Sequence, residues 1–84
     1  MTEFVVYVLK SEKHSKHYIG FSNSLINLFY SHNFLGRKGW TVRYRPWRVI
    51  HVEFFDSKKD AEKREKYLKT GVGREWLKNN VQDY

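Results

Sequence analysis

The apolar and aromatic positions of the chain fall first into three segments typical of β-strands. An unbroken apolar run from Phe4 to Leu9 predicts a central strand that is covered on both faces. A polar, turn-like stretch follows, and the segment from His17 to Phe21 predicts a second strand that forms a hairpin with the first. A third strand is predicted from Trp47 to Phe55. One face of this third strand is expected to carry Ile50, Val52 and Phe54.

Helical spacing appears between the second and third strands and again after the third. Ser22 to Ser24 offer N-cap residues. The apolar face that follows repeats at i, i+3, i+4 and i+7, and it consists of Leu25, Leu28, Phe29 and His32. This helix is expected to end between Asn33 and Gly39. Ser57 is expected to cap a second helix, with Asp60 as its capping-box partner, that runs to about Lys69 and stops at Gly71.

A short third helix is predicted to begin at Gly73, and its Trp76 and Leu77 can close the core. The expected order of elements is therefore β-β-α-β-α-α. Strands and helices in this order predict an α+β fold in which helices pack on a three-stranded sheet. A chain of 84 residues has room for one domain, so we expect residues 1–84 to form a single unit.

Composition limits the class of protein. An apolar share of 40% with 18% aromatic residues is enough for a small core and argues against a disordered tail. The chain contains no cysteine, which excludes a disulfide framework, a cysteine zinc site and a thiol nucleophile. Its apolar runs are too short for a membrane span or a secretory signal. We therefore expect a cytoplasmic protein without membrane contact.

Charge points to the kind of partner. Sixteen Lys and Arg residues against nine Asp and Glu residues give a net charge of +7 at neutral pH. This balance favours a polyanionic partner, with nucleic acid first and then an acidic protein or a membrane surface, although small proteins also use charge for solubility alone. Residues 37–48 interleave cations with aromatic rings, as expected for binding phosphates and stacking on bases, or else for a solvated loop in which Trp47 belongs to the core. The cations are Arg37, Lys38, Arg43, Arg45 and Arg48.

Two tyrosines of the hairpin could carry chemistry. A turn about Glu12 and Lys13 would place Tyr7 opposite Tyr18, with Cβ atoms about 5 Å apart. Such a pair is a common packing device, but two phenols at one place can also pass a proton to and from a water molecule. Gly20 lies on the same side of its strand as Tyr18 and leaves room for a ligand or another backbone.

Two further residues have polar side chains on apolar helical faces. Glu65 falls in line with Ala61 and Leu68, where a carboxylate must be paired, hydrogen-bonded or bound to a cation. It can be a salt-bridge partner at the edge of the core or a ligand of a divalent metal ion. His32 can be a satisfied core residue or a catalytic one, and it lacks the neighbours of a zinc site.

Taken in order, these segments resemble the GIY-YIG nuclease domain. Val5-Val6-Tyr7 and Tyr18-Ile19-Gly20 resemble its two signature triplets, and Arg45-Pro46-Trp47, Glu65 and residues 73–77 continue the likeness. The resemblance covers nearly the whole chain and is strongest to small stand-alone members related to the N-terminal domain of the excinuclease C subunit. It implies a three-stranded antiparallel sheet flanked by helices and a metal-dependent phosphodiesterase.

The resemblance also assigns roles. Tyr18 would help to activate the attacking water, Tyr7 would support it, His32 would be a further catalytic residue, and Glu65 would hold one Mg²⁺ or Mn²⁺ ion. Gly20 matches the glycine of the second triplet. The family usually carries a phosphate-binding arginine ten residues after the second-triplet tyrosine, and this chain has Leu28 there.

Two main functions therefore stand side by side. The first is a DNA endonuclease, in which an arginine of residues 37–48 would substitute for the missing one. The second is a nucleic-acid-binding module without efficient cleavage, and a protein-interaction domain on the same scaffold is a third. DNA is the expected partner, RNA is the other polyanion that the charge allows, and we expect a monomer.

Overall fold

The structure is a computed structural model that describes residues 3–23 and 46–84. Its elements are three strands, β1 (Phe4–Ser11), β2 (His17–Ser22) and β3 (Trp47–Phe55), followed by two helices, α3 (Lys58–Leu68) and α4 (Gly71–Asn80). The strands form one antiparallel sheet in the order β2-β1-β3. The predicted α+β fold is confirmed. The helix predicted on Leu25, Leu28, Phe29 and His32 lies outside the described residues.

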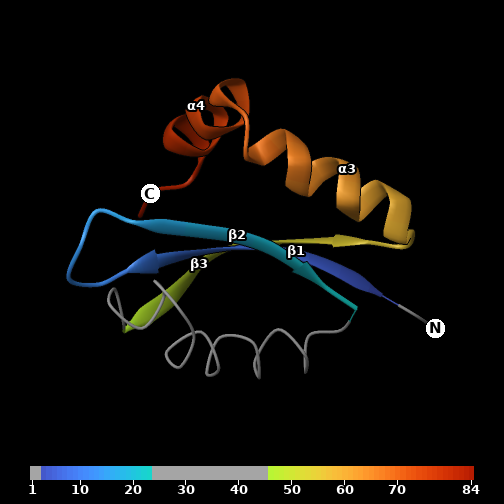
Figure 1. Cartoon of the computed structure of the whole chain (residues 1–84), viewed down its shortest axis with the longest axis horizontal. Helices are drawn as coiled ribbons and strands as arrows, with labels where there is room; N and C mark the ends of the chain where they lie inside the picture. The colour runs from blue at the N-terminus through green and yellow to red at the C-terminus, as the bar shows by residue number, and fades with distance from the viewer. Residues whose placement is uncertain (1–2, 24–45) are drawn as a thin grey trace.

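The central strand is covered on both faces, as its unbroken apolar run predicts. Every residue from Val5 to Leu9 is buried, and alternate side chains enter two separate clusters. Val6 and Val8 point to the face of the sheet that α3 and α4 cover. Figure 1 shows both helices on this side of the sheet. Val5 and Leu9 point to the opposite face.

The helix-covered face holds the larger cluster. Val6, Val8 and Ile19 of the sheet pack there against the helices and the segment after α4. The helical side of the cluster consists of Ala61, Leu68, Leu77 and Val81. Trp76 packs at its margin, so the prediction that Trp76 and Leu77 close the core is confirmed.

The register of the hairpin differs from the predicted one. Tyr7 lies opposite Gly20, and Tyr18 lies opposite Leu9. The Ser11 N–H donates to the Lys16 carbonyl over 2.9 Å, which closes the turn one residue further along the chain than a turn about Glu12 and Lys13 would. The prediction that Tyr7 and Tyr18 face each other directly is wrong for this reason, although both remain on one face of the sheet.

A β-bulge changes which residues of β3 share a face. The partner of Val8 is His51, but the partner of Leu9 is Val49, so Ile50 is an extra residue in the ladder. Ile50 packs on the helix-covered face, whereas Val52 packs on the opposite one. The prediction that Ile50 shares a face with Val52 and Phe54 is therefore wrong, because the extra residue interrupts the alternation of side chains between the two faces.

Side-chain caps define the two helices. The Ser57 hydroxyl accepts a hydrogen bond from the Asp60 N–H at the start of α3, as predicted. The Thr70 hydroxyl accepts from the Gly73 N–H, so α4 already begins at Gly71. Gly71 is thus the first residue of α4 and not the residue that ends α3. Gly73 lies against the backbone of Tyr67 and Leu68, where a Cβ atom would collide, and this close approach sets the corner between the helices.

Candidate active site

Tyr7 and Tyr18 lie together on the face of the sheet opposite the helices. Their ring centroids are 6.3 Å apart and the ring planes differ by 21°, so the rings are stacked and offset. Tyr7 pairs with Gly20 and Tyr18 pairs with Leu9, so the two tyrosines are diagonal neighbours across the hairpin. Trp47 packs its ring edge-on against Tyr18 at 6.5 Å and is only 5% exposed. Trp47 is therefore a core residue that orients Tyr18 and not a ring available to a base.

Gly20 explains how Tyr7 fits beside Tyr18. A Cβ atom at this position would lie 2.8 Å from the Tyr7 hydroxyl oxygen and 3.1 Å from a ring carbon of Tyr18. Contacts this short do not occur in a packed core without movement of the neighbours. The space left by the glycine is thus filled by the Tyr7 phenol, which lies over β2 at this residue. Tyr7 is 4% exposed while Tyr18 is half-buried, so Tyr18 is the tyrosine more accessible to solvent.

Glu65 lies on α3 between the buried residues Ala61 and Leu68, as its spacing predicts. Its side chain is 17% exposed, and one carboxylate oxygen lies 3.6 Å from the Lys69 amine, one helical turn further on. Lys69 in turn lines a cavity together with Tyr18. Glu65 is therefore joined through Lys69 to the edge of the sheet that carries Tyr18.

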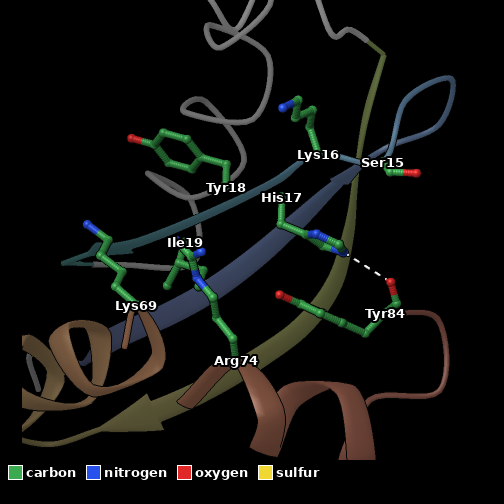
Figure 2. A pocket seen from close by; sticks show the side chains of 8 residues that line it. All are labelled: Ser15, Lys16, His17, Tyr18, Ile19, Lys69, Arg74 and Tyr84. Atoms are coloured by element: carbon green, nitrogen blue, oxygen red, sulfur yellow. Dashed lines mark hydrogen bonds between the residues drawn. The ribbon is translucent and has the colours of Figure 1, made fainter. Parts of the chain in front are cut away.

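The cavity at this edge has a volume of 520 Å³. Figure 2 shows its walls, which come from the end of the hairpin turn, from β2 and from the helical side of the sheet. The residues that line it are Ser15, Lys16, His17, Tyr18, Ile19, Lys69, Arg74 and Tyr84.

Comparison with known proteins places this arrangement in a family. The model of the GIY-YIG catalytic domain matches residues 3–79. The chain belongs to the GIY-YIG family. It is 34% identical over 64 residues to the UPF0213 protein CPE1444 of Clostridium perfringens, an overlap that covers 76% of this chain and 68% of that protein. The solution NMR structure of the UPF0213 protein BH0048 of Bacillus halodurans shares the fold, with a TM-score of 0.56 and 22% identity over 92% of this chain and 83% of that one.

Membership in this nuclease family supports a nuclease-type function, and the tyrosines and glycine of the two GIY-YIG triplets are the residues that the structure brings together. Other candidate residues lie outside the described ranges, and the structure says nothing about them: His32, Arg37, Lys38, Arg43 and Arg45. Arg48 is described. It lies on β3, and its half-exposed guanidinium is 3.9 Å from the Asp83 carboxylate.

The donor set suits only a sparsely coordinated metal ion. Within residues 3–23 and 46–84, no three side chains of the His, Cys, Asp and Glu types come close enough to hold an ion together. Glu65 is a single carboxylate, and Mg²⁺ is often bound by one or two carboxylates while waters and substrate phosphates complete its shell. Glu65 fits such an ion, provided that its oxygen exchanges the Lys69 amine for the metal.

A second polar cluster was not evident from the sequence. Arg64 of α3 donates two hydrogen bonds to Glu53 of β3, at 2.7 and 3.1 Å, and His51 lies 2.6 Å from the same carboxylate. The Arg64 guanidinium also lies over the Trp76 ring, 4.5 Å from its centre. Burial of the Glu53 carboxylate opposes its ionisation, but the hydrogen bonds from Arg64 and His51 outweigh this and hold its pKa below the usual value.

Apart from Tyr18, the residues that line the cavity were not predicted, and the reason is their separation in the chain. His17 and Tyr84 stack with ring centroids 3.8 Å apart, and the His17 ring nitrogen lies 3.1 Å from the main-chain oxygen of Tyr84, 67 residues away. No periodic pattern reports a contact between two such distant positions. Burial lowers the pKa of His17, and the nearby charges of Lys10 and Arg74 lower it further, against a smaller raising effect of the Tyr84 hydrogen bond.

Proposed function

We propose that this protein is a metal-dependent endonuclease that hydrolyses phosphodiester bonds of DNA. The observation that carries the proposal is the stacked pair of Tyr7 and Tyr18, which Gly20 makes possible, in a chain of the GIY-YIG family. A packing role alone does not require the second ring to be half-exposed at the margin of a cavity, as Tyr18 is.

The two phenols differ in the part they can play. Tyr18 reaches solvent, so its hydroxyl oxygen can accept a hydrogen bond from a water molecule and orient that water for attack on the phosphorus atom. Tyr7 is buried beside it and limits where the Tyr18 ring can lie. Orientation of this kind supplies a large share of catalysis, because a water held in line with the leaving oxygen reacts without a search for the right geometry.

Glu65 is the residue that would hold Mg²⁺ or Mn²⁺. When bound, such an ion would polarise a phosphoryl oxygen and offset the charge that develops there. In the absence of an ion, the Lys69 amine lies 3.6 Å from the Glu65 carboxylate. His32 remains a proposed catalytic residue on the family likeness alone.

DNA is the proposed substrate because the chain carries a net charge of +7. Arg48, with Arg37, Lys38, Arg43 and Arg45, is proposed to bind phosphates. RNA is the other polyanion with the required charge. The lack of cysteine agrees with action in the cytoplasm, and none of the described helices is both long and apolar enough to cross a membrane.

Nicking of supercoiled plasmid DNA, followed with Mg²⁺, with Mn²⁺ and with a chelator, tests this function. We expect nicking only with a metal ion, and Glu65→Gln should reduce the rate at least about 10²-fold because a neutral amide cannot replace the charged ligand. Glu62→Gln is the matched control, since Glu62 lies on the same helix and pairs with Lys58 at 3.9 Å. Equal rates for the two variants would contradict the metal role of Glu65.

The second candidate is a nucleic-acid-binding module that does not cleave efficiently. Leu28 favours it, because a neutral side chain stands where the family usually carries an arginine for the scissile phosphate. The same assay separates the two candidates. A wild-type protein that binds plasmid, branched and single-stranded DNA yet nicks none of them with either metal ion would establish the binding module instead.

A further inference from the structure

The cavity beside Tyr18 has features that the catalytic proposal does not use. It lies along β2, which is an edge strand of the sheet, and the lining residues His17 and Ile19 belong to the helix-covered face while Tyr18 belongs to the other. Figure 2 shows Lys69 and Arg74 extending from the helical side towards this edge. The lining thus includes residues from both faces of this edge strand, and the proposed catalytic tyrosine is one of them.

The charged side chains of the lining all have one sign. Three of the lining side chains are cations, Lys16, Lys69 and Arg74, and the lining includes no carboxylate side chain. Arg74 is exposed, and within the described residues its guanidinium has no hydrogen bond or ion pair. A guanidinium offers several donors in a planar fork that matches two phosphate oxygens. The cavity is therefore suited to an anion with oxygen acceptors.

The size and the aromatic content of the cavity indicate more than a bare anion. A volume of 520 Å³ lies within the range of about 300–1,000 Å³ that is typical of sites for small organic ligands and far exceeds the needs of one phosphate ion. The stacked rings of His17 and Tyr84 form one wall, and Tyr18 lines the cavity from the other side of β2. Aromatic surfaces next to cations are the usual platform for an unpaired base and its phosphate.

We propose that this cavity binds one nucleotide of the substrate strand, next to the phosphate that is cleaved. Its phosphate lies against Arg74 and Lys69, and its sugar and base lie against the aromatic wall. This assignment rests on the proposed function, because Tyr18 is shared between the cavity and the tyrosine pair. The Lys69 amine lies 3.6 Å from the Glu65 carboxylate, so the nucleotide phosphate and this carboxylate share one cation when no metal ion is bound.

Binding of a 5′-phosphorylated thymidine dinucleotide, without any metal ion, tests the site directly. The dissociation constant and the shifted amide signals are measured by NMR titration of the full chain. We expect shifts at His17, Tyr18 and Arg74, and we expect Arg74→Gln and Lys69→Gln each to weaken binding about tenfold, the effect of losing one charge-assisted hydrogen bond.

Lys59→Gln is the control for net charge. Lys59 is exposed on α3 and lies ten residues before Lys69, about 15 Å along the helix axis, which exceeds the screening length at physiological salt. It should change the dissociation constant by about twofold at most. A loss equal to that of Arg74→Gln would mean diffuse attraction by the whole protein and would overturn the site.

Two further ligands separate the parts of the nucleotide. The dinucleotide without its 5′-phosphate and inorganic phosphate should each bind at least about tenfold more weakly than the phosphorylated dinucleotide. Inorganic phosphate binding equally well would make the cavity a simple phosphate site and overturn the nucleotide assignment. Equal binding of the unphosphorylated dinucleotide would overturn the role of Arg74 and Lys69.

Failure of this inference and failure of the nuclease proposal give different results. A protein that binds the phosphorylated dinucleotide in this cavity but never nicks DNA keeps the nucleotide site and loses the endonuclease function. If the Arg74→Gln variant nicks DNA at the wild-type rate and the dinucleotide shifts no signals near His17 in the wild type, the endonuclease function stands and the nucleotide site is wrong.

Discussion

At the scale of single residues, the fit between Tyr7 and Gly20 is the feature on which the tyrosine pair depends. The Tyr7 hydroxyl and ring carbon Cζ lie 2.8 and 2.9 Å from where a Cβ atom of residue 20 would be. Gly20→Ala should therefore displace the phenol and lower the free energy of unfolding by about 1–3 kcal/mol, the usual effect of overpacking. Urea unfolding monitored by circular dichroism measures the change.

Gly71→Ala is the control for this substitution. Apart from the neighbouring residues and the helix backbone, no atom lies within 4 Å of a Cβ at residue 71, and the residue is the first of α4, where alanine favours the helix. It should leave stability unchanged or raise it by up to about 1 kcal/mol. A Gly20→Ala protein as stable as the wild type would show that Tyr7 does not need the space.

The sequence shows that residue 20 needs room but not what fills it. A glycine in a strand indicates a close approach by something, and a ligand or a backbone are the usual candidates. The occupant is Tyr7, and this depends on a register in which Tyr7 and Gly20 are partners. A shift of the hairpin turn by one residue was enough to change the pairs, and no local pattern of the polar turn decides between the two alternatives.

At the scale of elements, the contact of α3 with β3 depends on the Glu53–Arg64 pair. The pKa of Glu53 is lowered in the folded protein, so the carboxylate contributes stability above its usual pKa of about 4.3 and loses it as the pH falls through the lower folded value. Glu53→Gln should therefore be less stable than the wild type at neutral pH. The difference should shrink below about pH 4.

Urea unfolding of both proteins at several pH values between neutral and acid measures this difference. His17 adds a separate loss that begins below about pH 6.5, because its pKa is lowered by burial and the unfolded chain takes up the proton first. This loss is common to both proteins and cancels in the comparison. A difference between them that stays constant down to the most acid pH would contradict the ion pair.

The elements themselves could largely be predicted, and their fine alignment could not. Phe4 to Leu9 predicts a strand buried on both sides because both alternating faces are apolar, and the cap at Ser57 follows from the preferences of helix starts. The bulge at Ile50 was missed because one extra residue in a strand has no distinctive sequence signal. Gly71 was misplaced because Thr70 starts a new helix immediately.

At the scale of the whole molecule, the net charge of +7 predicts salt-sensitive binding to nucleic acid. If three to five phosphates of a duplex are neutralised, the logarithm of the affinity should fall against the logarithm of salt concentration with a slope of about −3 to −4.5. Arg48→Gln should flatten the slope by about one unit if this half-exposed guanidinium binds a phosphate. Fluorescence anisotropy with a labelled duplex at several salt concentrations provides the slopes. An affinity that does not change with salt would contradict electrostatic binding.

The candidate site could be predicted only in part, because some of its contacts are local in the chain and others join distant segments. Tyr7, Tyr18 and Gly20 lie within one hairpin, so a short stretch of sequence brings them together. The cavity joins that hairpin to α4 and to Tyr84, and such long-range contacts depend on how the helices pack over the sheet. Arg74 and Lys69 are ordinary surface cations in the sequence, and only the fold places them beside Tyr18.

The central claim is that the Tyr18 hydroxyl takes part in hydrolysis, and the nicking rate of Tyr18→Phe tests it most directly. Phenylalanine keeps the ring that stacks on Tyr7 and packs on Trp47, so stability should stay close to that of the wild type. Tyr67→Phe on the exposed side of α3 is the control and should nick at the wild-type rate. We predict that Tyr18→Phe loses at least about 10²-fold in metal-dependent nicking rate. A Tyr18→Phe protein that nicks supercoiled DNA as fast as the wild type and the Tyr67→Phe control would contradict the account.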